Sequence, residues 1–500
     1  MRSKTFLATG IFIMTNITFF TPAAVVVNEI PNATAASLAF TSNDPIVVQA
    51  RALVAQGRYA DADALSRQPG GDQTARQEMS EIIRRARQDY TLNDAQLLEK
   101  IQKSIPDATP ADLERWDAAG QLTFKTIDGQ RLYFGREPSN LFKLSDEART
   151  RAHKPKSLAD DATSKWKLVD HLAKVVADAE RTGDEFVDPI HHRIVYSLSI
   201  TPADGGAKPG SLLRVWLPYP QEYRQQRNVK MISMSPEGGF IAPTAVDGNP
   251  IKGAPQRTVY FEKKISDPKH EETFKIEFEY DSFAYYPKLD DAKVQPLPAD
   301  FDQSYLAERP PHIVFSPEIK NAVVQAVGDE TNPLIKARKI FHWIGSQVRY
   351  AFEDEYCTIP SYAQKIIMCK KGDCGIQATL FITMCRAAGV PARWQSGWES
   401  KVVGNSQHDW AEFYVAPWGW LPADQSYGLQ PSTDPKVREF YIGHQDAYRM
   451  IVNLDWGQPL QPPVKSLRSD PSDFQRGEVE IDGKNIYYDK WDYNIEYHRS

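Results

Sequence analysis

The sequence predicts an α+β fold in which a helical N-terminal region and a β-sandwich precede a mixed domain of helices and sheet. Apolar residues recur at helical spacing between residues 45 and 117, and strand-like segments bounded by Gly, Pro and Asp follow between residues 191 and 280. A broadly apolar helix that begins near residue 374 is followed by three more strand-like segments. The 500 residues are enough for roughly three domains of about 150 residues each.

The composition and charge of the chain exclude some classes of function. Hydrophobic residues make up 41% and charged residues 25% of the chain, which is typical of a soluble globular protein. The net charge of −6 comes from 59 basic and 65 acidic residues in short mixed clusters, so no basic face is available for a phosphate backbone. We therefore expect no nucleic-acid partner.

Export is predicted from the first residues of the chain. The start is basic, residues 5–27 are largely apolar and uncharged, and small residues near Ala23 and Ala35 offer cleavage sites. We expect a signal peptide over residues 1–35, a periplasmic or secreted protein, and no stable membrane span after removal of the signal. An uncleaved membrane anchor is the alternative.

The rest of the chain divides into segments of different character. The predicted segments are a helical region with a small strand insert (45–185), a β-sandwich (190–285), a proline-spaced linker (286–311), a mixed domain with the candidate site (312–460), and a C-terminal β-hairpin extension (461–500). The first long helix of the mixed domain should break at Asn332-Pro333, and the extension should turn at Asp482-Gly483.

Cys374 lies at the start of the most apolar helix that the sequence predicts. Asp373 precedes it as the expected N-cap, and the helix should end at Gly389. Unpaired backbone N–H groups and the positive end of the helix dipole favour a thiolate at the first turn. The charge of Asp373 opposes the thiolate, so a sulfur nucleophile here requires a base.

His408 and Asp424 are the candidate base and orienting acid on the strands that follow. An imidazole on one strand and a carboxylate on its neighbour would complete the arrangement of nucleophile, base and acid. A two-residue hairpin turn would leave Asp424 three residues, about 10 Å, short of His408, so a bulge or a break at Pro422 is required. Asp409 is the alternative acid, although it should point to the opposite face of the strand.

Four blocks of residues resemble the core of the transglutaminase-like superfamily. They are Gly-Asp-Cys-Gly at 372–375, Arg-Ala-Ala-Gly-Val-Pro-Ala-Arg at 386–393, His-Asp-Trp-Ala-Glu at 408–412, and Gly-Trp-Leu-Pro-Ala-Asp at 419–424. The resemblance implies a papain-like core, in which the nucleophile helix packs on an antiparallel sheet. It also implies that Cys374 is the nucleophile, His408 the general base and Asp424 the residue that orients the imidazole.

The resemblance further implies acyl transfer through a Cys374 thioester. We expect hydrolysis of a peptide or side-chain amide bond, as by a cysteine peptidase or amidase, with a peptide or protein substrate that could belong to the cell envelope. The alternatives are a protein-glutamine acyltransferase that cross-links proteins and a non-catalytic binding or scaffold protein with a vestigial triad. In the active case, pairing with His408 should lower the pKa of the thiol from about 8.5 to roughly 3.5–7.5.

Tryptophans and further cysteines surround the candidate triad. Trp398, Trp410 and Trp420 are candidates for a substrate groove, and ring packing beneath the hairpin is the alternative. Cys357 and Cys369 flank a short loop, so in an exported protein they either form a disulfide or remain two free thiols. The four cysteines lack Cys-x-x-Cys or neighbouring His spacing, so we expect no metal and no cofactor.

Overall fold

The computed structural model describes residues 38–152, 167–245, 253–401 and 405–499. Helices and strands are both abundant, and every sheet of three or more strands in these ranges is antiparallel, so the predicted α+β class is confirmed. The predicted signal peptide, residues 1–35, lies outside the described residues. Within the described ranges, no helix combines the length and apolar character that crossing a membrane requires.

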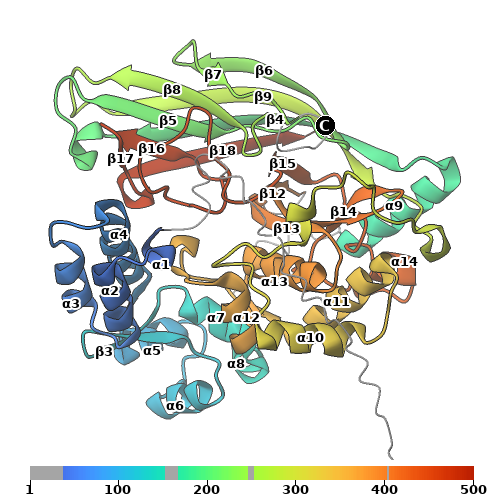
Figure 1. The fold of residues 1–500 in the computed structure, drawn as a ribbon, viewed down its shortest axis with the longest axis horizontal. Helices are drawn as coiled ribbons and strands as arrows, with labels where there is room; N and C mark the ends of the chain where they lie inside the picture. Colours follow the sequence, from blue (N-terminus) through green and yellow to red (C-terminus); the bar gives the residue numbers. More distant parts are fainter. Residues whose placement is uncertain (1–37, 153–166, 246–252, 402–404, 500) are drawn as a thin grey trace, which may run out of the picture. The chain divides into compact units, whose positions relative to one another are not determined.

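Short helices and one small sheet form the N-terminal region (Figure 1, blue to cyan). Its helices are α1 (Leu38–Thr41), α2 (Pro45–Ala55), α3 (Tyr59–Ser66), α4 (Gln73–Asp89), α5 (Asp94–Gln102), α6 (Pro110–Ala118), α7 (Glu137–Leu144) and α8 (Asp146–Arg151). Its strands are β1 (Tyr90–Leu92), β3 (Gln130–Phe134) and β2 (Phe124–Ile127), in that order across the sheet. Arg85 of α4 is buried and donates to the carbonyls of Arg468 and Ser469, which binds this region to the C-terminal part of the chain.

Two antiparallel sheets pack as a β-sandwich. One sheet has the order β18 (Trp491–Arg499), β4 (Phe186–Ile200), β9 (Glu272–Tyr285), β6 (Gln226–Ser235). The other has the order β17 (Lys484–Asn485), β16 (Glu478–Ile481), β5 (Leu212–Pro218), β8 (Thr258–Lys264), β7 (Phe240–Ile241). Alternate residues of β4, among them Ile194, Tyr196 and Leu198, are buried in one apolar cluster with Leu213 and Val215 of β5.

The C-terminal strands belong to the sandwich instead of forming a separate extension. β16 pairs with β5, and β18 pairs with β4 from Trp491 opposite Ile200 to Arg499 opposite His192. Figure 1 shows these red strands beside the green ones. The predicted turn at Asp482-Gly483 joins β16 only to the short β17. The pairing occurs because β4 and β5 would otherwise expose unpaired backbone groups at a sheet edge.

The mixed domain contains a second group of helices and a four-stranded sheet. Its helices are α10 (Pro317–Val327), α11 (Pro333–Gln347), α12 (Tyr362–Cys369), α13 (Cys374–Ala387), α14 (Pro435–Arg438) and the 3-10 helix η6 (Tyr356–Thr358). Its sheet has the order β14 (Gly419–Ala423), β13 (Asn405–Val415), β12 (Ala392–Ser400), β15 (Arg449–Asn453), while β10 (Arg349–Tyr350) and β11 (Lys371–Gly372) form a parallel pair. The chain breaks between α10 and α11 as predicted, because Asn332 caps α11 and Pro333 is its first residue.

The four-stranded sheet contributes to two apolar cores. Ala411 and Phe413 of β13 pack with α13 in one core. Trp398 of β12 and Met450 of β15 belong to the core of the sandwich. Helix α9 (Leu168–Thr182), predicted as part of the N-terminal region, packs into the same core as α13. This arrangement holds α13 against β13 and so brings Cys374 close to the strand that carries His408.

Candidate active site

Cys374 is the first residue of α13, and its thiol is partly accessible although most of the helix is buried. Asp373 caps the helix as predicted, because its carboxylate accepts the backbone N–H of Ile376. Helix N-termini stabilise nearby negative charge, so the position suits a thiolate. The Cys374 thiol itself donates a hydrogen bond to Asp409 Oδ2 over 3.4 Å. A carboxyl group, and not an imidazole, is therefore the hydrogen-bond partner of the sulfur in this structure.

Burial and carboxyl groups oppose the ionisation of Cys374. Desolvation raises the pKa of the Cys374 thiol well above its ordinary value, and Asp409 and Asp373 add to the rise. This direction is opposite to the lowered pKa predicted from a pairing with His408, because the nearest charged neighbours are acidic. The thiol in this arrangement stays protonated until a base removes its proton.

His408 and Asp424 form a buried pair. His408 Nε2 lies 2.7 Å from Asp424 Oδ2, and the two side chains are 6% and 3% exposed. A carboxylate at Nε2 accepts the N–H of that nitrogen, which leaves Nδ1 as the basic nitrogen of a neutral imidazole. The structure thus brings the predicted base and the predicted orienting acid into direct contact.

The end of β14 explains how Asp424 reaches His408. The hairpin closes through a three-residue loop, with Val415 opposite Gly419, instead of the two-residue turn assumed from the sequence. The ladder stops at Ala423, and Asp424 Oδ1 then accepts the hydroxyl of Ser426 in a bend of the chain. Because Asp424 leaves the strand, its carboxylate is not held at a ladder position and turns back to the imidazole.

Glu399 and Arg449 complete the surroundings of His408, and neither was predicted. Glu399 Oε1 lies 3.5 Å from His408 Nε2. Arg449 places Nη2 2.8 Å from Asp424 Oδ2 and Nη1 3.3 Å from Glu399 Oε1. Burial alone would raise the pKa of each carboxyl, but His408 and Arg449 hold the pKa values of Asp424 and Glu399 below their ordinary values. Both carboxylates therefore stay ionised beside the imidazole.

Glu399, His408 and Asp424 also present three donor atoms within 4.8 Å of one another. Such a set could suit a metal ion by its donor types. Arg449, however, contacts both carboxylates and already balances their charge, and a metal ion bound there would face its guanidinium group. We assign no metal to these residues.

One cavity of about 680 Å³ is lined by both Cys374 and His408. This volume lies in the range of sites that bind small ligands or short segments. The N-terminal region contributes Gln88, Asp89, Phe134, Gly135 and Arg136 to the wall, and the segment before β16 contributes Asp470, Asp473, Gln475 and Arg476. No chemistry was predicted for the first 180 residues, yet they form part of this wall. Their contribution depends on tertiary packing and has no local motif.

The family assignment follows from the same stretch of chain. Residues 320–425 match the model of the transglutaminase-like superfamily, and the match includes Cys374, His408 and Asp424. This stretch is a transglutaminase-like domain. The predicted resemblance and the papain-like order of helix and strands are thereby confirmed.

Two bacterial relatives share part of the sequence. An uncharacterized protein of Haemophilus influenzae is 31% identical over 148 residues, which is 25% of this chain and 40% of that protein. The uncharacterized protein YebA of Bacillus subtilis is 25% identical over 130 residues, which is 22% of this chain and 18% of YebA. This chain thus spans less than half of either relative, and the similarity concerns only that part.

Two solved structures are similar to this chain. A candidate cysteine protease from Cytophaga hutchinsonii gives a TM-score of 0.41 at 15% identity, over 63% of this chain and 91% of that one. The periplasmic domain of TgpA from Pseudomonas aeruginosa gives a TM-score of 0.25 at 12% identity, over 50% and 90% of the two chains. Neither similarity bears on the reaction of this chain.

The tryptophans of the transglutaminase-like domain do not line the cavity that contains Cys374. Trp398 and Trp410 are fully buried, and their indole N–H groups donate to the carbonyl of Gln475 and to Gln395 Oε1. The prediction that they form a substrate groove is therefore wrong, and the alternative of ring packing holds. Trp398 is buried in the core of the sandwich, and Trp410 in a small separate cluster with Tyr223 and Ile451.

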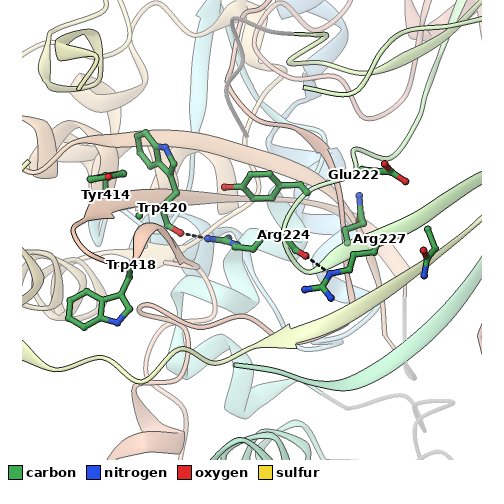
Figure 2. Close-up of a pocket in the computed structure, with 10 residues that line it drawn as sticks. Glu222, Arg224, Arg227, Tyr414, Trp418 and Trp420 are labelled. Atoms are coloured by element: carbon green, nitrogen blue, oxygen red, sulfur yellow. Dashed lines mark hydrogen bonds between the residues drawn. The ribbon is translucent and has the colours of Figure 1, made fainter. Parts of the chain in front are cut away.

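Trp420 lies at a different pocket, of about 810 Å³ (Figure 2). There Arg224 donates to the backbone carbonyl of Trp420, and Arg227 Nε donates to the carbonyl of Arg224 over 2.8 Å. Figure 2 also shows Tyr414 and Trp418 at this pocket. Since Cys374 does not line it, Trp420 is not part of the predicted groove either.

Cys357 and Cys369 are free thiols, so the predicted disulfide is absent and the alternative of two free thiols holds. Cys357 is buried, whereas Cys369 is exposed and donates to the carbonyl of Lys371 over 3.2 Å. The two residues lie on η6 and at the end of α12, which carry their side chains into different environments. A disulfide requires Cβ atoms within about 4.5 Å of each other.

Proposed function

We propose that this chain is an exported thiol enzyme that hydrolyses a peptide or side-chain amide bond through a Cys374 thioester. One observation carries the proposal: Cys374, at a helix N-terminus, lines the same cavity as His408, whose imidazole contacts the buried Asp424. Nucleophile, base and orienting acid are the parts that acyl transfer requires. Cross-linking of glutamine to an amine uses the same thioester and differs only in the acceptor.

The proposed reaction proceeds in two halves. His408 Nδ1 takes the thiol proton, and the Cys374 thiolate forms a bond to the carbonyl carbon of the substrate. The backbone N–H of Cys374 stabilises the oxyanion, a contribution worth about 10²–10³ in rate per donor. His408 returns its proton to the departing amine, which leaves the thioester. Water, deprotonated by His408, then releases the acid and restores the thiol.

The rate at which iodoacetamide alkylates Cys374 tests the pairing of sulfur and imidazole. We expect rapid labelling of Cys374 near pH 6 in the native protein, and labelling slowed about 10-fold or more in His408→Ala, because the thiol then lacks its base. Peptide mass spectrometry gives the rate for each cysteine between pH 5 and 9.

Glu399→Gln is the matched control for that measurement. This substitution also removes a carboxylate beside His408. Glu399 Oε1, however, lies 3.5 Å from His408 Nε2, whereas Asp424 Oδ2 lies 2.7 Å from it. We expect labelling within about 3-fold of the native rate in Glu399→Gln. Slow labelling of Cys374 that His408→Ala leaves unchanged would exclude the thiol enzyme.

The products of the reaction distinguish hydrolysis from cross-linking. We expect incubation with a mixture of peptides to yield new carboxyl groups at cleaved peptide bonds or at former glutamine side chains, even with a primary amine present. Water reaches the thioester without a dedicated acceptor site, which is why hydrolysis is the expected outcome. Mass spectrometry identifies both kinds of product, and incorporation of the amine into glutamine as the main product would overturn the hydrolase.

Export is the part of the proposal that rests on residues 1–35, which lie outside the described structure. A basic start followed by an apolar run and small residues supports cleavage by a signal peptidase. The N-terminal sequence of the protein recovered from the cell envelope or medium tests it. Recovery of the full-length chain from the cytoplasm would contradict export and leave the chemistry of Cys374 untouched.

A further inference from the structure

The N-terminal region is bound to the segment that precedes the nucleophile helix. Asn140 of α7 holds both backbone groups of Phe352: its Nδ2 donates to the Phe352 carbonyl over 2.9 Å, and its Oδ1 accepts the Phe352 N–H over 2.7 Å. Two residues further along, Asp354 Oδ2 lies 2.7 Å from the ammonium group of Lys125 on β2. Phe352 and Asp354 both line the cavity that contains Cys374. The N-terminal region therefore fixes one wall of the candidate active site.

Arg136 lies on this wall. It directly precedes α7, its side chain is exposed, and it lines the same cavity as Cys374 and His408. Its guanidinium carbon lies over the Phe352 ring, 3.4 Å from the ring centre. A planar guanidinium group that stacks on an aromatic face keeps the N–H groups at its edge free to donate. Because Asn140 holds the backbone of Phe352, the stacked guanidinium group is held at a defined place in the wall.

Arg136 differs from the other cations of the cavity wall in having no acidic partner. The other Lys and Arg side chains in the described part of the wall are Lys401 and Arg476. Lys401 Nζ lies 2.8 Å from Glu399 Oε2, and Arg476 Nη1 lies 3.1 Å from Glu355 Oε1. Among the residues that the structure describes, Arg136 forms no ion pair, and its guanidinium group donates no hydrogen bond. A carboxylate is the matching acceptor, because its two oxygens accept two parallel N–H groups of a guanidinium.

The acidic side chains of the cavity wall oppose a bound anion by their charge, but each already has a donor in this chain. Those that pair with Lys or Arg are Glu353, Asp354, Glu355 and Glu399. Those that accept hydrogen bonds from N–H groups are Asp89, Asp373, Asp409, Asp470 and Asp473. A substrate carboxylate is therefore expected only in direct contact with Arg136, and a second negative charge on the substrate should weaken binding.

We propose that Arg136 is a specificity-determining residue, which binds a carboxylate of the peptide substrate while Cys374 attacks a neighbouring amide bond. The C-terminal carboxylate of a peptide and an acidic side chain both offer this chemistry. The inference rests on the proposed thiol enzyme. It adds that the N-terminal region is part of the active site, because this region supplies Arg136 and holds the ring on which Arg136 stacks.

The alkylation of Cys374 by reagents with and without a carboxylate tests the inference in the full chain. The probes are iodoacetylglycine, iodoacetyldiglycine and iodoacetyltriglycine, each as the free acid and as the C-terminal amide, so that the reach to Arg136 varies. The ratio of the acid rate to the amide rate at Cys374 is divided by the same ratio at the exposed Cys369, which cancels the intrinsic reactivity of the reagents. We expect this quotient to reach about 10 for at least one length, the scale of a charge-assisted hydrogen bond.

Substitutions of Arg136 should lower this quotient. Arg136→Gln should lower it about 10-fold, because the carboxylate loses its cation and its paired donors. Arg136→Lys should keep part of it, since the charge remains and the fork of donors is lost. Iodoacetylglutamic acid α-amide, compared with iodoacetylglutamine α-amide, presents the carboxylate on a side chain. A preference for this acid that depends on Arg136 assigns the site to acidic side chains, and a preference confined to the glycine acids assigns it to the C-terminus of a peptide.

Arg131→Gln is the matched control, and it should leave the quotient within about 2-fold of the native value. Arg131 also stacks on an aromatic ring of the N-terminal region, 3.9 Å from the centre of Phe124, but it pairs with Asp117 and is not among the residues that line the cavity. Melting curves check the fold of each variant, and if Arg136→Gln does not fold, Arg136→Lys decides alone.

Two results would contradict the inference, and they are distinct from a failure of the proposed function. With Cys374 labelled by the amides in a manner that depends on His408, a quotient near one in the native protein would overturn the role of Arg136. A high quotient that the substitutions of Arg136 leave unchanged would overturn it as well. Absence of Cys374 labelling by every amide would instead overturn the proposed thiol enzyme.

Discussion

Replacing Cys374 by alanine should abolish turnover, with kcat lower by about 10⁶-fold, the scale seen when a nucleophile is removed from a triad. The thioester cannot form without the sulfur, and a water molecule in its place would not be held at the N-terminus of α13. The measurement is the initial rate of peptide or amide cleavage on a substrate found in the product screen. Binding of that substrate should persist, because the cavity walls other than Cys374 are unchanged.

Cys369→Ala is the matched control for this prediction. Cys369 is an exposed thiol at the end of α12 and does not line the cavity that contains Cys374. Its removal should leave kcat within about 2-fold of the native value, since exposed positions away from a site seldom affect it. Turnover by Cys374→Ala near the native rate would exclude a thioester and would move the search to the binding surfaces of the protein.

Replacing Arg449 by methionine should destabilise the protein by about 3–5 kcal/mol, the cost of removing one partner from a buried ionic network. Arg449 is 1% exposed and lies within 3.3 Å of Asp424, Glu399 and Asp446, whose side chains are 1–3% exposed. Without the guanidinium group, these carboxylates stay buried and lose the cation that contacts all three of them. Scanning calorimetry of the native and variant proteins measures the loss.

The stability lost in Arg449→Met should be larger at neutral pH than at acidic pH. His408 and Arg449 hold the pKa values of Asp424 and Glu399 below their ordinary values, so the stabilisation is complete above the unfolded-state values of about 3.9 and 4.3 and declines as pH falls toward the folded-state values. The difference between native protein and Arg449→Met should therefore be full at pH 7 and smaller below pH 4.

Arg67→Met is the matched control for Arg449. Arg67 pairs with Asp63 on α3, but its side chain is 70% exposed, so its removal should cost less than about 1 kcal/mol. An equal loss of stability in Arg449→Met and Arg67→Met would mean that the buried network contributes no more to stability than an exposed ion pair. The position of Arg449 at the start of the apolar strand β15 is a sequence signal for the network, because a charge on a buried strand requires a partner.

Local patterns in the sequence were sufficient to predict the α+β class and to select the three members of the candidate triad. The apolar helix after Cys374 had to be buried, its N-cap was readable as Asp373, and the strands with His408 and Asp424 followed at spacing that a hairpin can close. The hairpin register was mispredicted by one residue, because a three-residue loop and a two-residue turn are both compatible with the same residues.

Those local patterns could not predict which distant residues contact the candidate site. Arg449 donates to Asp424 across a separation of 25 residues, and Gln475 donates to Asp409 across 66. The tryptophans were mispredicted for the same reason: their density near the site suggested a groove, whereas Trp398 and Trp410 are fully buried in two different apolar clusters. Proximity in sequence did not decide which face of the sheet a side chain occupies.

By itself, the sequence predicted the secondary structure of the site and named Cys374, His408 and Asp424 as candidates, because helix caps, apolar periodicity and strand alternation are local properties. Only the tertiary structure decided that the sulfur faces Asp409, that Arg449 neutralises the acids at His408, and that the N-terminal region walls the cavity. The physical reason is that burial and charge at one point depend on every segment packed there, and those segments are brought together only by folding.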